Sequence, residues 1–109
     1  MLALLITFVI SGSVLAGVSI PLILERIPPN GLYGFRVRKT MENPQIWYPV
    51  NKFAGKRLFL ASLVITLAAV GVFFIPNLRI EVYSYAILGI WLIVFTSVIV
   101  STVRYMNSL

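Results

Sequence analysis

The sequence contains no cysteine and no histidine, and it has little charge: nine basic and three acidic residues in 109. Without thiols and imidazoles, a disulfide scaffold, a Cys/His zinc site and a Cys or His catalyst are excluded. Charged residues make up 11% and hydrophobic residues 60% of the chain, whereas a soluble domain carries about 25% charged residues. We therefore expect a membrane protein with no catalytic residue, no metal and no cofactor.

The charged residues separate three long neutral runs, at residues 1–24, 58–78 and 82–103. A hydrocarbon core of about 30 Å needs about 20 helical residues, and lipid requires every backbone group to be satisfied internally. No run has the polar stripe that a soluble helix presents to water. The sequence predicts an all-α integral membrane protein, a single domain over residues 1–109. Its transmembrane helices are expected at about 1–24, 58–77 and 82–103.

The first run could instead be a cleaved signal peptide, with Val14-Leu15-Ala16 as a small-residue cleavage site. It lacks a positively charged segment before the apolar stretch, and that stretch exceeds the usual length. We expect a retained helix.

Basic residues are distributed unequally, since seven of the nine lie in the loop 25–57. The positive-inside rule then places this loop and the C-terminus in the cytoplasm, and the N-terminus outside the cell membrane. The net charge of +6 favours anionic lipid as a partner over nucleic acid, because its bearers flank a membrane. Lys52, Lys56 and Arg57 are expected beside lipid phosphates.

The first part of this loop has the composition of a structured turn. Pro28-Pro29 ends the first helix, and Asn30-Gly31 favours a sharp turn. In an extended segment, Tyr33 and Phe35 would point to one side and Arg36 to the other. This pattern fits either an anion-binding site or an interfacial anchor.

The second part of the loop predicts a short interfacial helix at about 44–56. Asn43-Pro44 is typical of an N-cap followed by proline at the first helical position. Pro49 is expected to bend this helix or delay its start. Three residues recur at a spacing of four and share one face: Trp47, Asn51 and Gly55. They fit either a polar-aromatic contact or simple anchoring at the membrane.

No neutral run contains an acid or base, although ion-coupled transporters need such a group inside the membrane. The three glutamates, Glu25, Glu42 and Glu81, are too few for Mg-ATP chemistry. Transport and catalysis are therefore disfavoured, and we expect no enzyme. Small residues four apart, such as Gly12 and Ala16, suit close helix packing, and three helices leave surface for a homodimer.

One succession of motifs resembles the SdpI family of bacterial and archaeal membrane proteins. It comprises Pro29-Asn30, Tyr33-Gly34-Phe35-Arg36, Thr40, Trp47 and Asn51-Lys52-Phe53-Ala54-Gly55, followed by a hydrophobic hairpin. The motif part spans about residues 28–57. The resemblance implies immunity against a secreted, membrane-active peptide toxin, and a receptor role that recruits a cytoplasmic regulator. The family's namesake is longer, with further spans before this unit, so the implied function is less specific than the implied fold.

The resemblance also supplies candidate site residues: Asn30, Tyr33, Gly34, Arg36, Thr40, Trp47, Asn51 and Gly55. Arg36 and Asn51 are expected to form a hydrogen-bonding pair covered by Trp47, and the set either binds a ligand or holds the loop to the helices. Two other functions remain open. One is an accessory subunit of a larger membrane complex, and the other is a lipid- or amphiphile-binding membrane protein.

Overall fold

The computed structural model describes residues 1–109 and is entirely helical. It contains α1 (Leu2–Ile23), α2 (Arg38–Glu42), α3 (Pro44–Phe73) and α4 (Ile80–Asn107). Three of these helices are long and apolar enough to cross a membrane, namely α1, α3 and α4. The predicted all-α fold with three membrane-length helices is confirmed.

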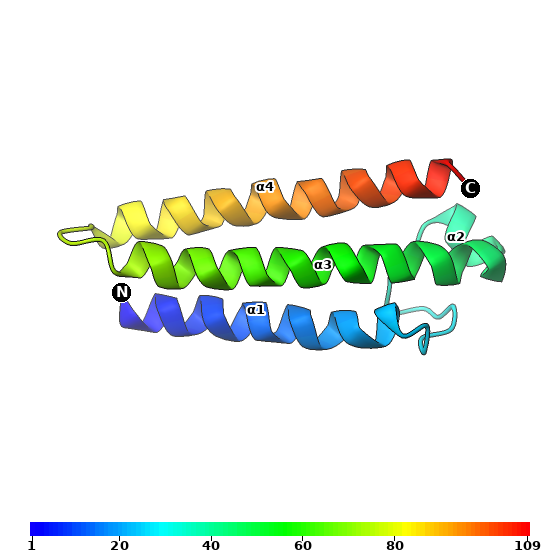
Figure 1. Ribbon diagram of the computed structural model, residues 1–109, viewed down its shortest axis with the longest axis horizontal. Coiled ribbons are helices and arrows are strands. Elements are labelled where there is room, and N and C mark those ends of the chain that lie inside the picture. Colours follow the sequence, from blue (N-terminus) through cyan, green and yellow to red (C-terminus); the bar gives the residue numbers. More distant parts are fainter.

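The three long helices lie side by side in one elongated bundle, with α3 between α1 and α4 (Figure 1). The molecule measures 52 × 22 × 19 Å. Successive helices run in opposite directions. The N-terminus and the α3–α4 link therefore lie at one end, and the C-terminus lies at the other end with α2 (Figure 1). We call the segment between α1 and α3, residues 24–43, the connection.

The ends of α1 and α3 follow local capping rules. Beyond α1, Glu25 adopts a positive φ of 58°, and the Arg26 N–H donates to the Pro21 carbonyl at 3.0 Å. This bond closes a Schellman-type helix end. Helix α3 begins after Asn43, whose side chain accepts the Gln45 N–H at 2.9 Å. The predicted N-cap with proline at the first helical position is confirmed.

The expected division between an interfacial helix at 44–56 and a span at 58–77 is wrong, because α3 runs without a break from Pro44 to Phe73. Pro49 lies inside it. A proline here removes only the N–H that would bond the carbonyl of residue 45. Since Gln45 is exposed, solvent can satisfy that carbonyl and the helix continues.

One hydrophobic cluster of the core lies toward the end that holds the N-terminus. It contains one aromatic residue from α1, one small residue from α3 and two residues from α4: Phe8, Ala69, Tyr83 and Ile87. The Tyr83 hydroxyl donates to the Ala69 carbonyl at 2.9 Å, so its buried polar atom is satisfied. Small residues bring the helices together, and a Cβ on Gly12 would overlap Thr66 Oγ1.

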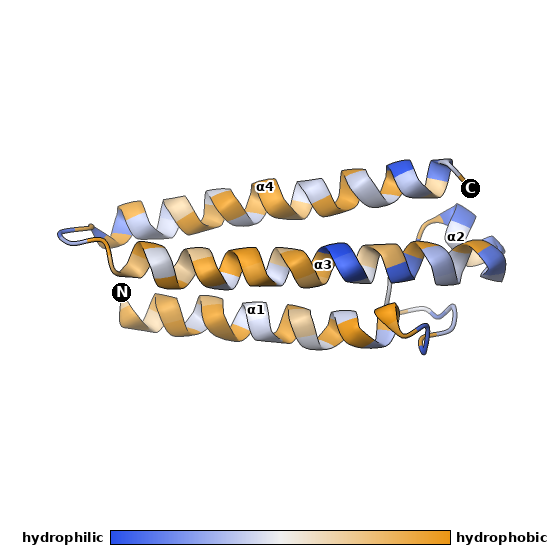
Figure 2. Cartoon of the chain, in the orientation of Figure 1, coloured by the Kyte–Doolittle hydropathy of each residue, from blue (hydrophilic) through white to orange (hydrophobic).

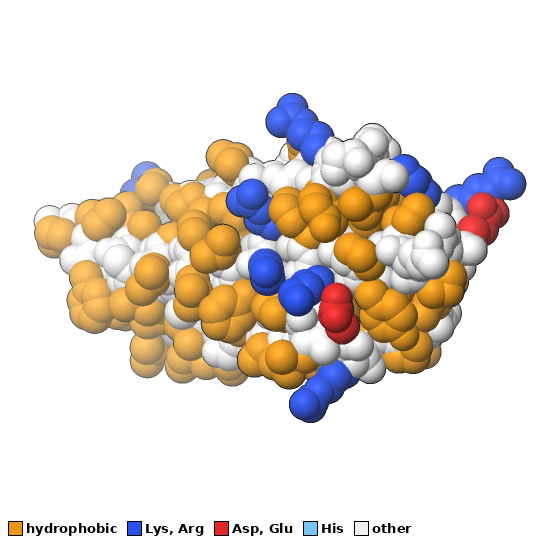
Figure 3. Space-filling view, turned by 45° about the vertical axis from the view of Figure 1, so that its right-hand side comes forward, with side chains coloured by type: hydrophobic (Ala, Val, Ile, Leu, Met, Phe, Trp, Pro, Cys, Tyr) orange, Lys and Arg blue, Asp and Glu red, His pale blue; other side chains and the backbone are white.

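Large apolar side chains cover the outside of the bundle. On α4, Leu92 is 69% exposed and Ile93 is 72% exposed. Hydrophobic residues run along all three long helices, whereas hydrophilic residues gather mainly at the end with α2 (Figure 2). Most of the charged side chains gather over this same end (Figure 3). An outer surface of this kind suits lipid as the surrounding solvent.

Candidate functional site

The connection turns at Asn30, whose side chain forms four hydrogen bonds to nearby backbone. Its Oδ1 accepts the N–H groups of Leu32 and Tyr33 at 2.8 and 2.7 Å. Its Nδ2 donates to the carbonyls of Pro28 and Tyr33 at 2.8 and 2.9 Å. Asn30 therefore shapes the turn that directs the following residues back toward the helices.

Gly34 lies in close contact with α3. It has a φ of +110°, and a Cβ there would lie 2.8 Å from Asn51 Oδ1 and 3.0 Å from the Trp47 ring. Both the backbone conformation and the available space require glycine.

Asn51 and Trp47 are both buried in α3. Their side chains hold the connection by hydrogen bonds to its backbone. Asn51 Oδ1 accepts the Phe35 N–H, and its Nδ2 donates to the Trp47 carbonyl at 3.0 Å. Trp47 Nε1 donates to the Ile27 carbonyl at 2.7 Å. Because a buried polar group without a partner is costly, these bonds fix the connection on α3.

Thr40 caps the N-terminal end of the short helix α2. Its side chain is fully buried and accepts the Val37 N–H at 3.0 Å. The hydroxyl lies 2.9 Å from the carbonyls of both Phe35 and Val37. Thr40 therefore ties α2 to the segment that Asn51 holds.

The predicted pair between Arg36 and Asn51 under Trp47 is wrong. Asn51 is occupied by the Phe35 N–H and the Trp47 carbonyl. Arg36 is exposed, and it forms no hydrogen bond or salt bridge, the two salt bridges being Arg38–Glu42 and Arg79–Glu81. The extended backbone places Phe35 against the helices and Arg36 outward, as its alternation predicts.

Gly55 lies away from the connection, at the contact between α3 and α1. A Cβ on Gly55 would lie 3.0 Å from the Ser19 carbonyl and 3.0 Å from Leu22 Cβ. Its role is therefore to allow close helix packing.

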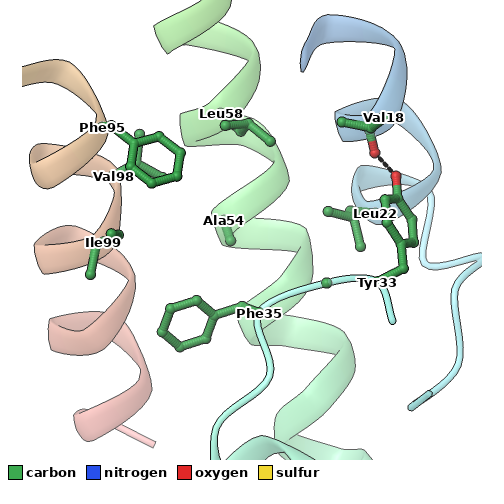
Figure 4. A pocket seen from close by; sticks show the side chains of 10 residues that line it. Val18, Leu22, Tyr33, Phe35, Ala54, Leu58, Phe95, Val98 and Ile99 are labelled. Carbon is green, nitrogen blue, oxygen red and sulfur yellow. Dashed lines mark hydrogen bonds between the residues drawn. The ribbon is translucent and has the colours of Figure 1, made fainter. Parts of the chain in front are cut away.

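An apolar cavity of about 200 Å³ lies where the connection meets all three long helices. Figure 4 shows it between residues of α1, α3 and α4, with Tyr33 and Phe35 entering from the connection. The lining residues are Val18, Leu22, Tyr33, Gly34, Phe35, Ala54, Leu58, Phe95, Val98 and Ile99.

Tyr33 is the only lining residue whose side chain carries a polar group. Its hydroxyl donates to the Val18 carbonyl of α1 (Figure 4). Burial removes water from the phenol and raises the pKa of Tyr33 above its ordinary value of 10.0. The neutral phenol therefore holds the connection against α1 at physiological pH.

The sequence analysis placed all eight candidates in the loop 25–57. Seven of them lie in the connection or contact it, Gly55 packs against α1 instead, and the cavity was missed. Tyr33 and Gly34 line it, whereas Asn30, Thr40, Trp47 and Asn51 position the connection around it. The lining residues of α4, Phe95, Val98 and Ile99, gave no signal because their run carries no charge and no polar stripe that would mark an inward face.

The fold and the apolar surface define a multi-pass membrane protein with three candidate spans. The model of the SdpI/YfhL protein family matches residues 26–104, most of the chain, and the protein belongs to this family. At family level this membership supports a membrane protein of the immunity type. The curated proteins and the solved structures yielded no match to the chain.

Proposed function

We propose that the protein gives the cell that makes it immunity to a membrane-active peptide, and that the peptide binds at the apolar cavity. Family membership supports the immunity class. The cavity carries the assignment of the site, because it is where the three helices meet the connection. In this proposal the protein binds its ligand without catalysing a reaction.

The chemistry of the cavity suits one apolar segment of a membrane-inserted peptide. Nine of its ten lining residues are hydrophobic, so it offers dispersion contacts and no charge. Arg36 follows Phe35 directly and has no partner within the chain. Its guanidinium is free to bind a carboxylate of the peptide, a strong charge-assisted interaction.

We further propose that the connection and the C-terminus face the cytoplasm, where the connection would reach a cytoplasmic regulator. The bias of basic residues toward segment 25–57 supports this orientation. Cysteines placed singly at positions 30, 78 and 109 of the cysteine-free chain test it. A membrane-impermeant thiol reagent applied to intact cells should label position 78 alone. Labelling of position 30 from outside would reverse the orientation.

Filling the cavity tests the proposed binding site. Ala54 lies on its wall and is 8% exposed, so Ala54→Leu adds an apolar side chain to the cavity. We expect cells expressing this variant to lose protection against a membrane-active peptide that the unaltered protein resists. Ala3→Leu is the matched control, because Ala3 is exposed on α1. Full protection by a membrane-inserted Ala54→Leu protein would remove the cavity from the mechanism.

Arg36 allows a second test that leaves the fold intact. Because Arg36 has no internal partner, Arg36→Ala should leave membrane insertion unchanged while it lowers survival in the same assay. The control is Arg38→Ala, which removes an exposed arginine that pairs only with Glu42. If both variants protected cells as well as the unaltered protein does, Arg36 would not contact the peptide. Protection lost equally in both would indicate a general effect of charge.

A further inference from the structure

A second hollow, of about 300 Å³, lies at the charged end of the bundle and differs in chemistry from the apolar cavity. We call it the lysine hollow. Its lining comes from the start of the connection, the first turns of α3 and the last turns of α4: Glu25, Pro49, Lys52, Phe53, Lys56 and Tyr105.

The lysine hollow and the apolar cavity lie on different sides of α3. Ala54 lines the cavity, and Lys52 and Lys56 are each two residues from it. Two residues correspond to about 200° around a helix, so both lysines point away from the cavity. They are also one turn apart and therefore share a face.

Neither lysine has an anionic partner in the chain. The two salt bridges join Arg38 to Glu42 and Arg79 to Glu81. Glu25 borders the same hollow but lies within salt-bridge distance of neither lysine. Two ammonium groups against one carboxylate give the hollow a net positive charge.

Two aromatic side chains that pack against each other, Phe53 and Tyr105, form part of the lining of the hollow. The rings of Phe53 and Tyr105 are stacked with centroids 4.5 Å apart and planes 6° from parallel. The Arg57 guanidinium lies 5.2 Å from the Phe53 ring centroid. Phe53 thus packs against Tyr105 of α4 and lies beneath Arg57 of its own helix, while Lys52 and Lys56 remain free to bind a ligand.

The depth of the lysine hollow matches that of lipid headgroups. Lys56 and Arg57 are the last charges before the neutral run 58–78, so the hollow begins where the hydrocarbon core ends. Aromatic rings and lysines are both enriched at this level of a membrane protein. The anion most abundant at this depth is a lipid phosphate.

We propose that the lysine hollow is a binding site for one anionic phospholipid, with Lys52 and Lys56 binding its phosphate and the Phe53–Tyr105 stack contacting its glycerol region. This site is independent of immunity and of the apolar cavity. It goes beyond a general attraction of basic residues to the membrane, because it assigns the binding to two lysines among nine basic residues.

The test titrates the full chain in detergent with phosphatidylglycerol or with phosphatidylcholine of the same acyl chains, and measures lipid-bound species by native mass spectrometry. We expect phosphatidylglycerol to bind at least tenfold more tightly. Each lysine near an anionic lipid contributes about fivefold, so Lys52→Gln/Lys56→Gln should weaken phosphatidylglycerol binding about 25-fold. The control Arg26→Gln/Arg38→Gln removes the same charge at the same end outside the hollow, and should retain tight binding.

Glu25→Gln gives a change in the opposite direction, which a misfolded variant would not produce. Removing the carboxylate beside the lysines should strengthen phosphatidylglycerol binding. Equal weakening in both double variants would overturn the proposal, because it would show a general charge effect. Unchanged or weaker binding in Glu25→Gln would also overturn it. Displacement of the lipid by inorganic phosphate at equal concentration would assign the hollow to a soluble anion instead.

Discussion

Substitution of Gly34 by alanine should detach the connection from α3 while leaving the three long helices in place. An L-residue at a φ of +110° costs about 1–3 kcal/mol. The new Cβ would also lie 2.8 Å from Asn51 Oδ1 and 3.0 Å from the Trp47 ring, and overpacking of this kind costs about 1–3 kcal/mol. The two effects together disfavour the docked connection by about 2–6 kcal/mol. A tenfold change in population corresponds to about 1.4 kcal/mol, so the detached form should increase at least about 25-fold.

Trp47 reports this detachment, because its side chain is fully buried in the docked state. In a Trp91→Phe background, acrylamide should quench Trp47 fluorescence much more strongly in Gly34→Ala than in the parent protein. Gly31→Ala is the matched control, since a Cβ on Gly31 meets nothing within 4 Å. Circular dichroism should remain helical in both variants. If Gly34→Ala and Gly31→Ala gave the same quenching, the contact among Gly34, Trp47 and Asn51 would not hold the connection.

Two further perturbations test the remaining contacts. Gly55→Ala places a Cβ 3.0 Å from the Ser19 carbonyl and should lower the free energy of unfolding in mixed micelles by about 1–3 kcal/mol. Gly71→Ala, with nothing within 4 Å, should not lower it. Burial raises the pKa of Tyr33 above 10.0, so folding favours the neutral phenol. This stabilisation is complete below the unfolded-state pKa and is lost as pH rises through the raised value. Tyr33→Phe should remove a late-titrating group from the tyrosinate absorbance, and a normal titration of Tyr33 would contradict its docking.

The spans could be predicted from the sequence because a charge is costly in lipid, and its absence over about 20 residues marks a helix of known length. The cap at Asn43 was predictable for a similar reason, since side chain and backbone are neighbours in the sequence. The delayed start expected from Pro49 was wrong, because Pro49 lies close enough to the start of α3 for solvent to satisfy the freed carbonyl, and α3 begins at Pro44.

The partners of Asn51 could not be predicted from side-chain chemistry alone. Arg36 and Asn51 are suitable hydrogen-bonding residues. However, Gly34 brings the backbone so close to α3 that the Phe35 N–H, and not Arg36, donates to Asn51 Oδ1. The apolar cavity could not be predicted from the sequence either. Six of its ten lining residues come from the three uncharged runs, where no polar stripe shows which side chains face inward.

The residues of the motif therefore have one of two roles: they hold the connection in place, or they are free to bind a ligand. Substitution tests binding by itself only for a residue of the second kind. Asn30, Thr40, Trp47 and Asn51 each hold backbone groups of the connection, so their removal would damage the fold and the proposed site together. Arg36 has no such bond and can report binding by itself.

The hydrogen bonds of the connection also link the apolar cavity to the charged end of the molecule. Tyr33 bonds the Val18 carbonyl on α1, and Lys39 donates to the Met106 carbonyl at the end of α4 at 3.2 Å. The connection thus joins the two helices that flank the cavity. A ligand that separates α1 from α4 would act against these two bonds, because both start from the same short segment. Occupancy of the cavity would then change the outer surface of the connection, which is the surface that a regulator at this end would contact.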